Sequence, residues 1–383
     1  MMEKVKCGID VLKGNSGIIK GSNIGLITNH TGVDGNLKST IDIVNEIGKL
    51  KCLFSPEHGV RGNFQAGVHV SDYVDDKTGV TVYSLYGDIK MPTEYMLKDI
   101  DVILFDMQDV GARYYTYLYT MAYAMQAAKK FDKKFVVLDR PNPIGGIQVE
   151  GNILNTEFSS FVGMYPIPVR YGLTIGELAA LINKEFDIDC DLEVIKLENW
   201  DRKMYYDDTL LNFIAPSPNI PTIDSAILYI GTCLFEGTNV SEGRGTTQPF
   251  QIIGAPWIDC YKLADQLNEL NLEGVIFRPH YFTPTFSKYQ GELCQGIQIH
   301  ITSRETIRPF EVGVNIVYNI YKNYREFEFI SPKNERGKFS FDLLAGTDEL
   351  REAIINGTID EYLEKCKNEV MQFESTRKDY MLY

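Results

Sequence analysis

The sequence lacks the short motifs by which many enzymes bind metals, nucleotides or disulfide partners. No CxxC, HxH or HExxH pattern occurs, and only five histidines are present. No GxGxxG follows the first predicted strand and there is no Walker A motif, so a nucleotide cofactor is disfavoured. The cysteine count, seven, is odd, which argues against a disulfide framework or a structural zinc site. We therefore expect no cofactor and no metal, and we expect reduced, mostly buried cysteines.

A surplus of positive charge and long apolar runs are also absent. The net charge is −14, whereas a nucleic-acid binder needs clustered Lys and Arg to neutralise phosphates. No apolar run reaches the roughly 18 residues of a membrane span, and the N-terminus has no apolar core of a signal peptide. We expect a cytoplasmic protein with a small-molecule substrate and no nucleic-acid or membrane partner. The oligomeric state cannot be read from the sequence.

The first half of the chain alternates short apolar runs with amphipathic segments. Strands are predicted at 24–28, 50–54, 80–85, 102–105, 135–138 and 192–197, and helices at 39–48, from 92, at 114–131 and at 174–186. This alternation indicates an α/β fold with a Rossmann-like, doubly wound, mostly parallel sheet.

The proline-rich segment 215–222 interrupts this pattern, so we predict domains at 1–222 and 223–383. The second domain should be a smaller α+β unit that closes a cleft. Its predicted strands are 275–278 and 296–301, and its predicted helices are 261–270, 310–321 and 348–356.

The loop after the second predicted strand concentrates reactive groups. Glu57, His58 and Arg61 lie among glycines, which permit close approach of a ligand. The carboxyl ends of parallel strands share one edge of a sheet, where open α/β folds bind ligands. Partial burial there can raise the pKa of a carboxyl, as a general acid requires. Glu57 is therefore the first candidate for the catalytic group, although an ordinary loop with a satisfied ion pair is the alternative.

Two further strands end in polar loops at the same predicted edge. Asp106 and Gln108 follow one strand, with Arg113 shortly after, and Arg140 and Asn142 follow the next. Asp106 is expected to touch the substrate or the catalytic acid. Arg140 could clamp a carboxylate with two hydrogen bonds, or it could only anchor its loop.

Asn29 and His30 follow the first predicted strand and are further candidates for substrate binding. The competing hypothesis is a metal site, because His30, His58 and Asp106 could meet in space at the sheet edge.

The second half has one segment that resembles a binding loop. Between Leu234 and Thr247 it carries Glu236, Asn239, Glu242 and Arg244 among small residues. Either glutamate could be a second catalytic carboxylate. Tyr114, at the start of a predicted helix, is another candidate, although most of the tyrosines near it should be core.

Several of these loops together resemble one known family. The motifs include SPEHGVRG, FDMQDVGARYYTY, LDRPNPIGG, PSPNIPT, GTCLFEGTNVSEGRGTTQPF and FRPHYFTPTFSKYQGE, in this order. They are similar to the family first called domain of unknown function 1343, which contains the NamZ-type exo-acting β-N-acetylmuramidases. The similarity runs from about Gly8 to Leu350.

The resemblance implies removal of N-acetylmuramic acid from the non-reducing end of peptidoglycan fragments, with the site in a cleft between two domains. Glu57 matches the glutamate proposed as catalytic in the family. We expect it to be the general acid, with His58 beside it. The second role stays open between Asp106, Glu242, Tyr114 and the N-acetyl group of the substrate.

Muramic acid carries a lactyl carboxylate, so its pocket should contain a cation. The candidates are Arg61, Arg113, Arg140, Arg170 and Arg244, with Gln108, Asn142 and Asn239 for hydroxyl and acetamide groups. Many relatives look exported. The lack of a signal peptide suggests that this chain trims muropeptide fragments during recycling in the cytoplasm. A metal-dependent amidase or esterase acting on cell-wall fragments and a non-catalytic muropeptide-binding protein are the alternative functions.

Overall fold

The first half of the chain forms one seven-stranded sheet. The structure is a computed structural model that describes residues 3–56, 59–61, 72–87, 89–332 and 337–383. The strands are β1 (Asn23–Thr28), β2 (Lys49–Ser55), β3 (Tyr73–Val74), β4 (Thr81–Ser84), β5 (Val102–Asp106), β6 (Lys134–Leu138) and β7 (Leu192–Ile195). Their order is β3-β4-β2-β1-β5-β6-β7, and β3 alone among these strands pairs antiparallel. If β3 is left out and the six parallel strands are numbered afresh along the chain, their order is 3-2-1-4-5-6, that of a Rossmann sheet. This order confirms the predicted fold class.

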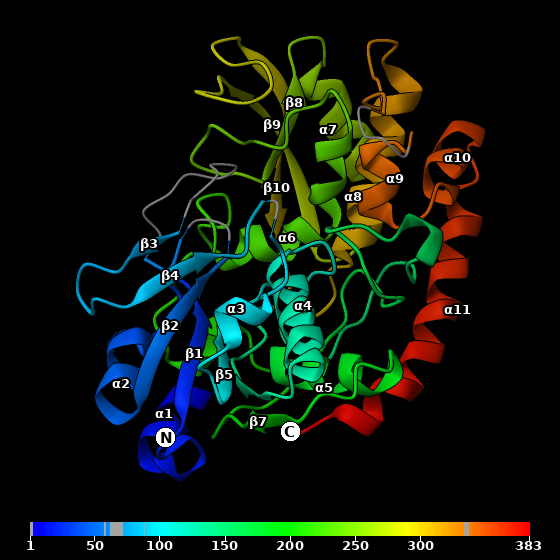
Figure 1. The fold of residues 1–383 in the computed structure, drawn as a ribbon. Coiled ribbons are helices and arrows are strands. Elements are labelled where there is room, and N and C mark those ends of the chain that lie inside the picture. The colour runs from blue at the N-terminus through cyan, green and yellow to red at the C-terminus, as the bar shows by residue number, and fades with distance from the viewer. Residues whose placement is uncertain (1–2, 57–58, 62–71, 88, 333–336) are drawn as a thin grey trace.

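Helices cover both faces of this sheet (Figure 1). They are α1 (Gly8–Gly14), α2 (Thr40–Ile47), α3 (Glu94–Leu97), α4 (Tyr117–Lys130) and α5 (Ile175–Glu185). Alternate strand residues point to opposite faces. Leu26 and Leu104 belong to the apolar cluster that includes α1 and α2, whereas Ile27 and Phe105 belong to the cluster that includes α4 and α5. The sheet is therefore doubly wound, because helices cover both faces and the central strands β1 and β5 are buried on both.

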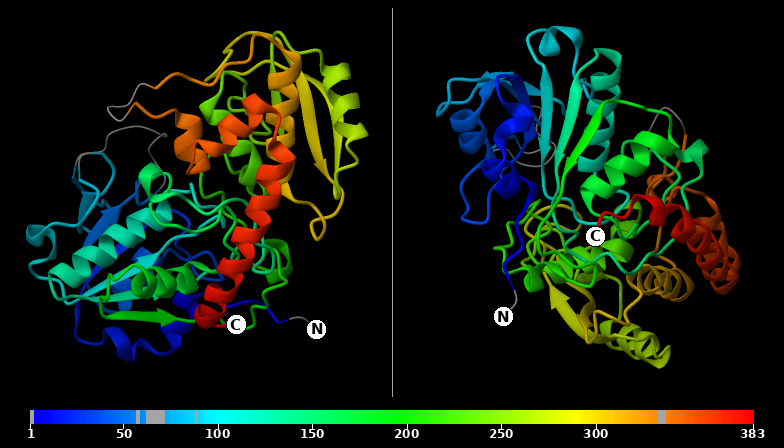
Figure 2. Two further views of the ribbon diagram at one scale, coloured as in Figure 1. Left: turned by 90° about the vertical axis from the view of Figure 1, so that its right-hand side faces the viewer. Right: turned by 90° about the horizontal axis from the view of Figure 1, so that it is seen from below.

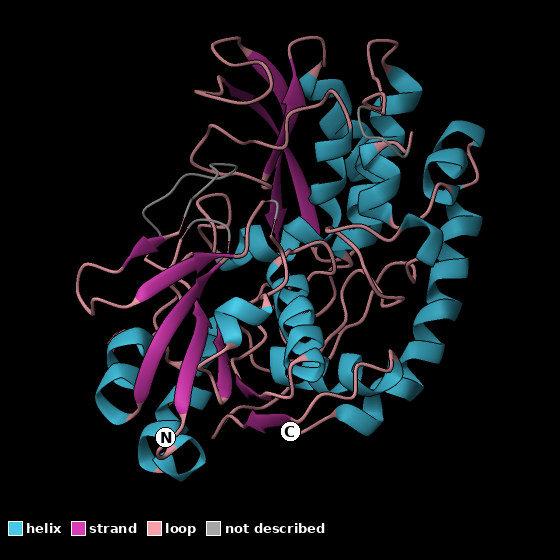
Figure 3. Ribbon diagram, in the orientation of Figure 1, coloured by secondary structure: helices cyan, strands magenta, loops and turns pink. Residues whose placement is uncertain are grey.

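The second half builds a smaller α+β unit, as predicted (Figure 3). Its antiparallel sheet has the order β8-β10-β9. The elements are α6 (Ile223–Thr232), β8 (Ile252–Ala255), α7 (Cys260–Glu269), β9 (Val275–Phe282), β10 (Cys294–Ile301), α8 (Pro309–Asn323), α9 (Ser340–Ala345), α10 (Glu349–Asn356) and α11 (Ile359–Arg377). Helices α6 and α8 cross at Gly231 and Gly313, where a Cβ on Gly231 would lie 1.9 Å from the Pro309 carbonyl oxygen.

The last helix returns to the first sheet domain instead of staying with the small one. Helix α11 runs alongside both parts of the molecule (Figure 2). The Arg377 guanidinium donates to the carbonyl oxygens of Gly146, Gly172 and Ile147, at 2.8 to 3.0 Å. These contacts connect the C-terminal helix to loops of the first half. None of the helices in the described part of the chain is both long and apolar enough to cross a membrane.

Helix α4 begins later than predicted, at Tyr117 instead of Tyr114. The reason is tertiary. Ala112 forms a β-bridge with Arg170, and the Arg113 amide donates to the Val169 carbonyl oxygen at 2.8 Å. This extended connection delays the helix and places Tyr114 in the preceding loop.

Candidate active site

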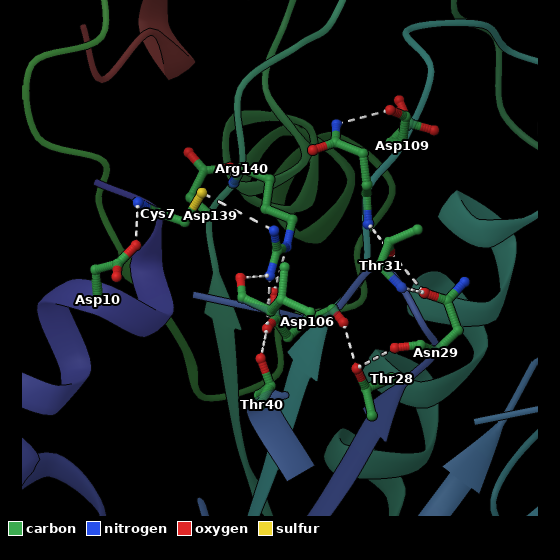
Figure 4. Close-up of polar contacts among 12 residues, drawn as sticks. Cys7, Asp10, Thr28, Asn29, Thr31, Thr40, Asp106, Asp109, Asp139 and Arg140 are labelled. Atoms are coloured by element: carbon green, nitrogen blue, oxygen red, sulfur yellow. Dashed lines mark hydrogen bonds and ion pairs between the residues drawn. The ribbon is translucent and has the colours of Figure 1, made fainter. Parts of the chain in front are cut away.

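The carboxyl ends of β1 and β5 lie side by side at the point where the strand order reverses. Thr28 at the end of β1 is in register with Asp106 at the end of β5, and its hydroxyl donates to the Asp106 carbonyl oxygen at 2.7 Å. The helix after β1 covers one face of the sheet and the helix after β5 covers the other. Ligands of open α/β sheets bind in the crevice that this divergence leaves. The residues that follow β1, β5 and β6 surround this edge (Figure 4).

A buried ion pair occupies the centre of this edge. Arg140 donates from Nε and Nη2 to the two carboxylate oxygens of Asp106, at 2.5 and 2.9 Å, and Thr40 donates to the same carboxylate. Asp106 is 0% exposed and Arg140 is 2% exposed. The contacts engage both carboxylate oxygens and orient Asp106, and its catalytic role stays a prediction. Arg140 is likewise the partner of Asp106 and not a free clamp for a substrate.

Asn29 and Gln108 are linked through Thr31 beside this pair. The Asn29 side-chain oxygen accepts hydrogen bonds from the backbone N–H and the hydroxyl of Thr31. The Thr31 hydroxyl in turn accepts a hydrogen bond from the backbone N–H of Gln108, at 2.9 Å. Asn29 Nδ2 and Gln108 Oε1 are buried and have no hydrogen-bond partner among the residues that the structure describes. Buried polar groups in native proteins are nearly always paired. This donor and this acceptor are therefore unsatisfied among the described residues, and the binding roles of Asn29 and Gln108 stay a prediction.

One ring nitrogen of His30 is engaged by the backbone. Its Nε2 lies 2.8 Å from the Ala215 carbonyl oxygen, an acceptor, so Nε2 carries the proton. Asp106 is engaged by Arg140 and Thr40. The residues described contain no group of three or more His, Cys, Asp or Glu side chains arranged to hold a metal ion. Of the three predicted ligands, His58 lies outside the described residues, as does Glu57.

A pocket of about 290 Å³ lies next to this edge, between the two halves of the chain. Tyr86, Tyr114 and Tyr115 line it from the first half, and Tyr229 and Phe250 line it from the second. Tyr86 follows β4, two residues beyond Ser84, and Ser84 pairs in register with Ser55 at the end of β2. The pocket therefore borders the sheet edge at which β2 ends.

Glu236 lines this pocket, and Arg244 links it to a second glutamate, Glu242, which has a different environment. Glu242 is 3% exposed, and it receives Arg244 Nε at 3.1 Å and Lys288 Nζ at 2.9 Å on its two oxygens. Glu236 lines the pocket and is 31% exposed, and its Oε1 receives Arg244 Nη2 at 2.6 Å. Burial raises the pKa of Glu236, and the charge of Arg244 partly opposes this. The predicted catalytic candidate Glu242 is thus fully paired, whereas Glu236 presents a carboxylate edge to the pocket.

Most of the other predicted binding residues stabilise the fold. Arg113 is fully buried, and its guanidinium donates to four backbone carbonyls, including that of Ala345 at 2.5 Å. Arg170 donates to Glu150 at 2.8 Å in a buried pair. Asn142 and Asn239 each bond backbone groups, the carbonyls of Leu173 and Glu326 among them. These side chains hold loops and do not face the pocket.

Arg61 and Tyr114 also differ from their predicted roles. Arg61 donates from Nε and Nη2 to Asp75, at 2.7 and 2.9 Å, and these hydrogen bonds lower the pKa of Asp75 to about 2. The Tyr114 hydroxyl donates to the Ile230 carbonyl oxygen, and burial raises its pKa well above the usual value. Tyr114 therefore contributes a ring face to the pocket but no free hydroxyl.

Sequence reasoning missed Thr40 and Lys288. Thr40 bonds Asp106, and Lys288 donates to Glu242 and to two backbone carbonyls, those of Phe235 and Val240. A threonine at the start of a helix is explained by helix capping, so the sequence gives no further reason to assign Thr40 to the site. Lys288 lies in the family motif FRPHYFTPTFSKYQGE, and its place in that motif could have marked it as a candidate site residue.

The fold is that of an α/β protein with a Rossmann-like sheet and a second, smaller sheet, and its pocket is lined by residues of both halves of the chain, Glu236 among them. The chain matches two family models, those described as exo-beta-N-acetylmuramidase NamZ, N-terminal, over residues 24–224, and NamZ, C-terminal, over residues 227–383. The chain belongs to the NamZ family.

Known proteins resemble the chain over almost its whole length. It is 53% identical to the peptidoglycan beta-N-acetylmuramidase NamZ of Bacillus subtilis (strain 168), over 99% of this chain and 92% of that protein. A crystal structure of a DUF1343 family protein from Bacteroides fragilis NCTC 9343 superposes with a TM-score of 0.90 at 41% identity, covering 99% of both chains. A second DUF1343 structure from the same organism has a TM-score of 0.80 at 34% identity, covering 100% of this chain and 99% of that one.

Proposed function

We propose that the protein is a glycoside hydrolase that removes N-acetylmuramic acid from the non-reducing end of peptidoglycan fragments. The observation that carries this proposal is the 53% identity, over 99% of the chain, to a peptidoglycan beta-N-acetylmuramidase. The pocket supports an exo mode of action. Its volume of about 290 Å³ is near the lower end of the roughly 300–1,000 Å³ of ligand pockets, which suits one terminal sugar better than a continuous glycan.

Glu57 is the proposed general acid. The argument for it is its place in the chain, two residues beyond Ser55, the last residue of β2, at an edge that borders the pocket. Protonation of the leaving oxygen is the step that a glycosidase assigns to such a carboxyl. Asn29 Nδ2 and Gln108 Oε1, the buried donor and acceptor at this edge, are proposed to bind polar groups of the substrate.

Arg244 is the proposed reader of the lactyl carboxylate. Of the five predicted arginines, it is the one that lines the described pocket. Its Nε and Nη2 bind Glu242 and Glu236, while its Nη1 makes no hydrogen bond to a residue that the structure describes. A guanidinium is suited to directional binding of a carboxylate, so Nη1 is available for the substrate.

We place the reaction in the cytoplasm, during recycling of muropeptide fragments. All seven cysteines are buried free thiols, which suits a reducing compartment. Fractionation of cells followed by immunodetection tests this location, and recovery of the protein outside the cytoplasm would contradict it.

The activity is tested by incubating the protein with a disaccharide that has N-acetylmuramic acid at its non-reducing end, and with longer glycans. Mass spectrometry should detect free N-acetylmuramic acid and chains shortened from that end, with no internal fragments. Hydrolysis of the same linkage should be slower when N-acetylglucosamine replaces N-acetylmuramic acid. Release of a stem peptide instead of a sugar, lost with a chelator and restored with zinc, would favour the amidase alternative.

A further inference from the structure

Glu236 has two carboxylate oxygens with different surroundings. It lies in the short 3-10 helix Cys233–Gly237 that follows α6. Arg244 Nη2 donates to Oε1 at 2.6 Å, and the Cys233 thiol lies 4.0 Å from the same oxygen. Oε2 accepts no hydrogen bond from any residue that the structure describes. The carboxylate is therefore anchored on one side and open on the other.

The open side faces a pocket with several aromatic rings in its walls. Tyr229, Phe250 and Tyr114 contribute rings to the walls near Glu236, and Cys233 adds an apolar thiol. Tyr229 and Phe250 pack edge to face, with ring centroids 4.7 Å apart, so this wall is rigid. A carboxylate oxygen beside aromatic rings suits a ligand group that combines an N–H with a methyl group.

Two other described carboxylates near the pocket, those of Asp106 and Glu242, are engaged on both oxygens. Asp106 is bound by Arg140 and Thr40, and Glu242 is bound by Arg244 and Lys288. Glu236 is the one described carboxylate among the pocket residues. Lys288 and Arg244 balance the charges of the two glutamates, so the cluster can remain in place without a bound cation.

We propose that Glu236 Oε2 receives the N–H of the 2-acetamido group of the terminal sugar, and that this acetamide attacks the anomeric carbon. This inference rests on the proposed function, which supplies the N-acetylated sugar. The apolar walls would hold the acetyl methyl group, and Arg244 would fix the direction of the carboxylate. Glu236 is then a catalytic residue and the second catalytic group.

The reaction balances in two steps. The acetamide oxygen forms a bond to the anomeric carbon as the glycosidic bond breaks. The leaving oxygen takes a proton from the general acid, and the amide proton passes to Glu236, which leaves a neutral oxazoline. Water then attacks the anomeric carbon as the bond from that carbon to the acetamide oxygen breaks, and the water gives a proton to the former acid. Glu236 returns its proton to the nitrogen, which restores the acetamide. Burial raises the pKa of Glu236 and so makes it a stronger acceptor for the amide proton.

The first experiment uses only the unaltered protein. Its turnover of a 4-nitrophenyl β-glycoside of N-acetylmuramic acid is compared with that of the N-trifluoroacetyl analogue. The fluorines weaken the acetamide oxygen as a nucleophile, so kcat/KM should fall by at least about tenfold. Equal rates on both substrates would overturn the proposal.

The second experiment compares Glu236→Gln with Glu361→Gln, which changes an exposed glutamate on α11. Glu236→Gln should lower kcat by about 100-fold, with KM changed by less than about threefold, and it should flatten the response to fluorination. Glu361→Gln should match the unaltered protein. A Glu236→Gln variant with kcat within about threefold of normal would overturn the proposal while leaving the activity itself established. An unaltered protein that releases no N-acetylmuramic acid would overturn both.

Discussion

Arg140 and Asp106 form a bidentate ion pair across the neighbouring strands β5 and β6. The two hydrogen bonds measure 2.5 and 2.9 Å, and both side chains are almost completely buried. Arg140 also donates to the Val33 carbonyl oxygen at 2.8 Å, in the segment between β1 and α2. The pair therefore holds together the loops that carry Asn29 and Gln108 and orders the sheet edge.

Breaking this pair should destabilise the protein strongly. In Asp106→Asn the guanidinium loses its counter-charge inside the protein, and we expect a loss of about 3–5 kcal/mol in the free energy of unfolding. Urea denaturation measures the change. The matched control is Asp75→Asn, whose partner Arg61 has a side chain that is 33% exposed, and it should lose less than the buried pair. Equal losses in the two variants would contradict the role given to burial.

Arg113 should connect the sheet domain to α9. Its Nη1 donates to the carbonyl oxygens of Asn152 and Ile167, and its Nη2 donates to that of Ala345. Arg113→Met leaves these buried carbonyls without a donor, and we expect a loss of about 2–4 kcal/mol in the free energy of unfolding. Denaturation curves test this, and Arg325→Met, at an exposed arginine, should have little effect. A stability loss below about 1 kcal/mol in Arg113→Met would disprove the bridging role.

Asp109 should make stability depend on pH. Burial raises its pKa from 3.8 to about 6, although Tyr171 and the Gly111 amide donate to it. The folded state thus holds the proton more tightly than the unfolded state. Protonated Asp109 therefore contributes about 3 kcal/mol to the free energy of unfolding. This stabilisation is fully present below about pH 4 and is lost as the pH rises through about 6.

Asp109→Asn, which resembles the protonated acid, should remove most of this dependence. Unfolding free energies measured at intervals from pH 4 to pH 7 should fall less in the variant than in the unaltered protein. Asp99→Asn, at an exposed carboxyl, is the control and should leave the slope unchanged. If the free energy of unfolding changed with pH by the same amount in all three proteins, the pH dependence could not come from Asp109.

Glu57→Gln should remove the proposed general acid. We expect a loss of about 100- to 10,000-fold in kcat on the natural disaccharide, where the leaving oxygen needs a proton. The loss should be smaller on a 4-nitrophenyl glycoside, because nitrophenolate leaves without protonation. Glu361→Gln is again the control. If the loss were equal on both substrates, the acid role would not hold for Glu57.

The sequence predicted the positions of most strands and helices because their apolar periodicity is a local property. It placed the strand over 102–105, and the structure has β5 at Val102–Asp106. It started α4 too early because the aromatic run from Tyr114 continues the apolar pattern. The Arg113 amide, bonded to the Val169 carbonyl oxygen, keeps that stretch extended, and this contact spans too many residues to be read locally.

The catalytic candidates were harder to predict than the fold. Polar residues at strand ends indicated an edge where buried polar groups do gather, but their partners lie far away in the chain. Arg170 pairs with Glu150, and Arg140 pairs with Asp106, 34 residues earlier. A side chain that appears free for substrate in the sequence is often bound to such a partner in the structure.

The sequence alone determined that this chain is a Rossmann-like α/β protein of the NamZ type, because periodicity and family motifs are both written along the chain. Only the tertiary structure decided which polar groups remain open. Glu242 meets both Arg244 and Lys288, whereas Glu236 meets Arg244 on one oxygen and faces the pocket with the other. The physical reason is that hydrogen bonding and burial depend on neighbours brought together by folding, and these set which carboxylate can act on a ligand.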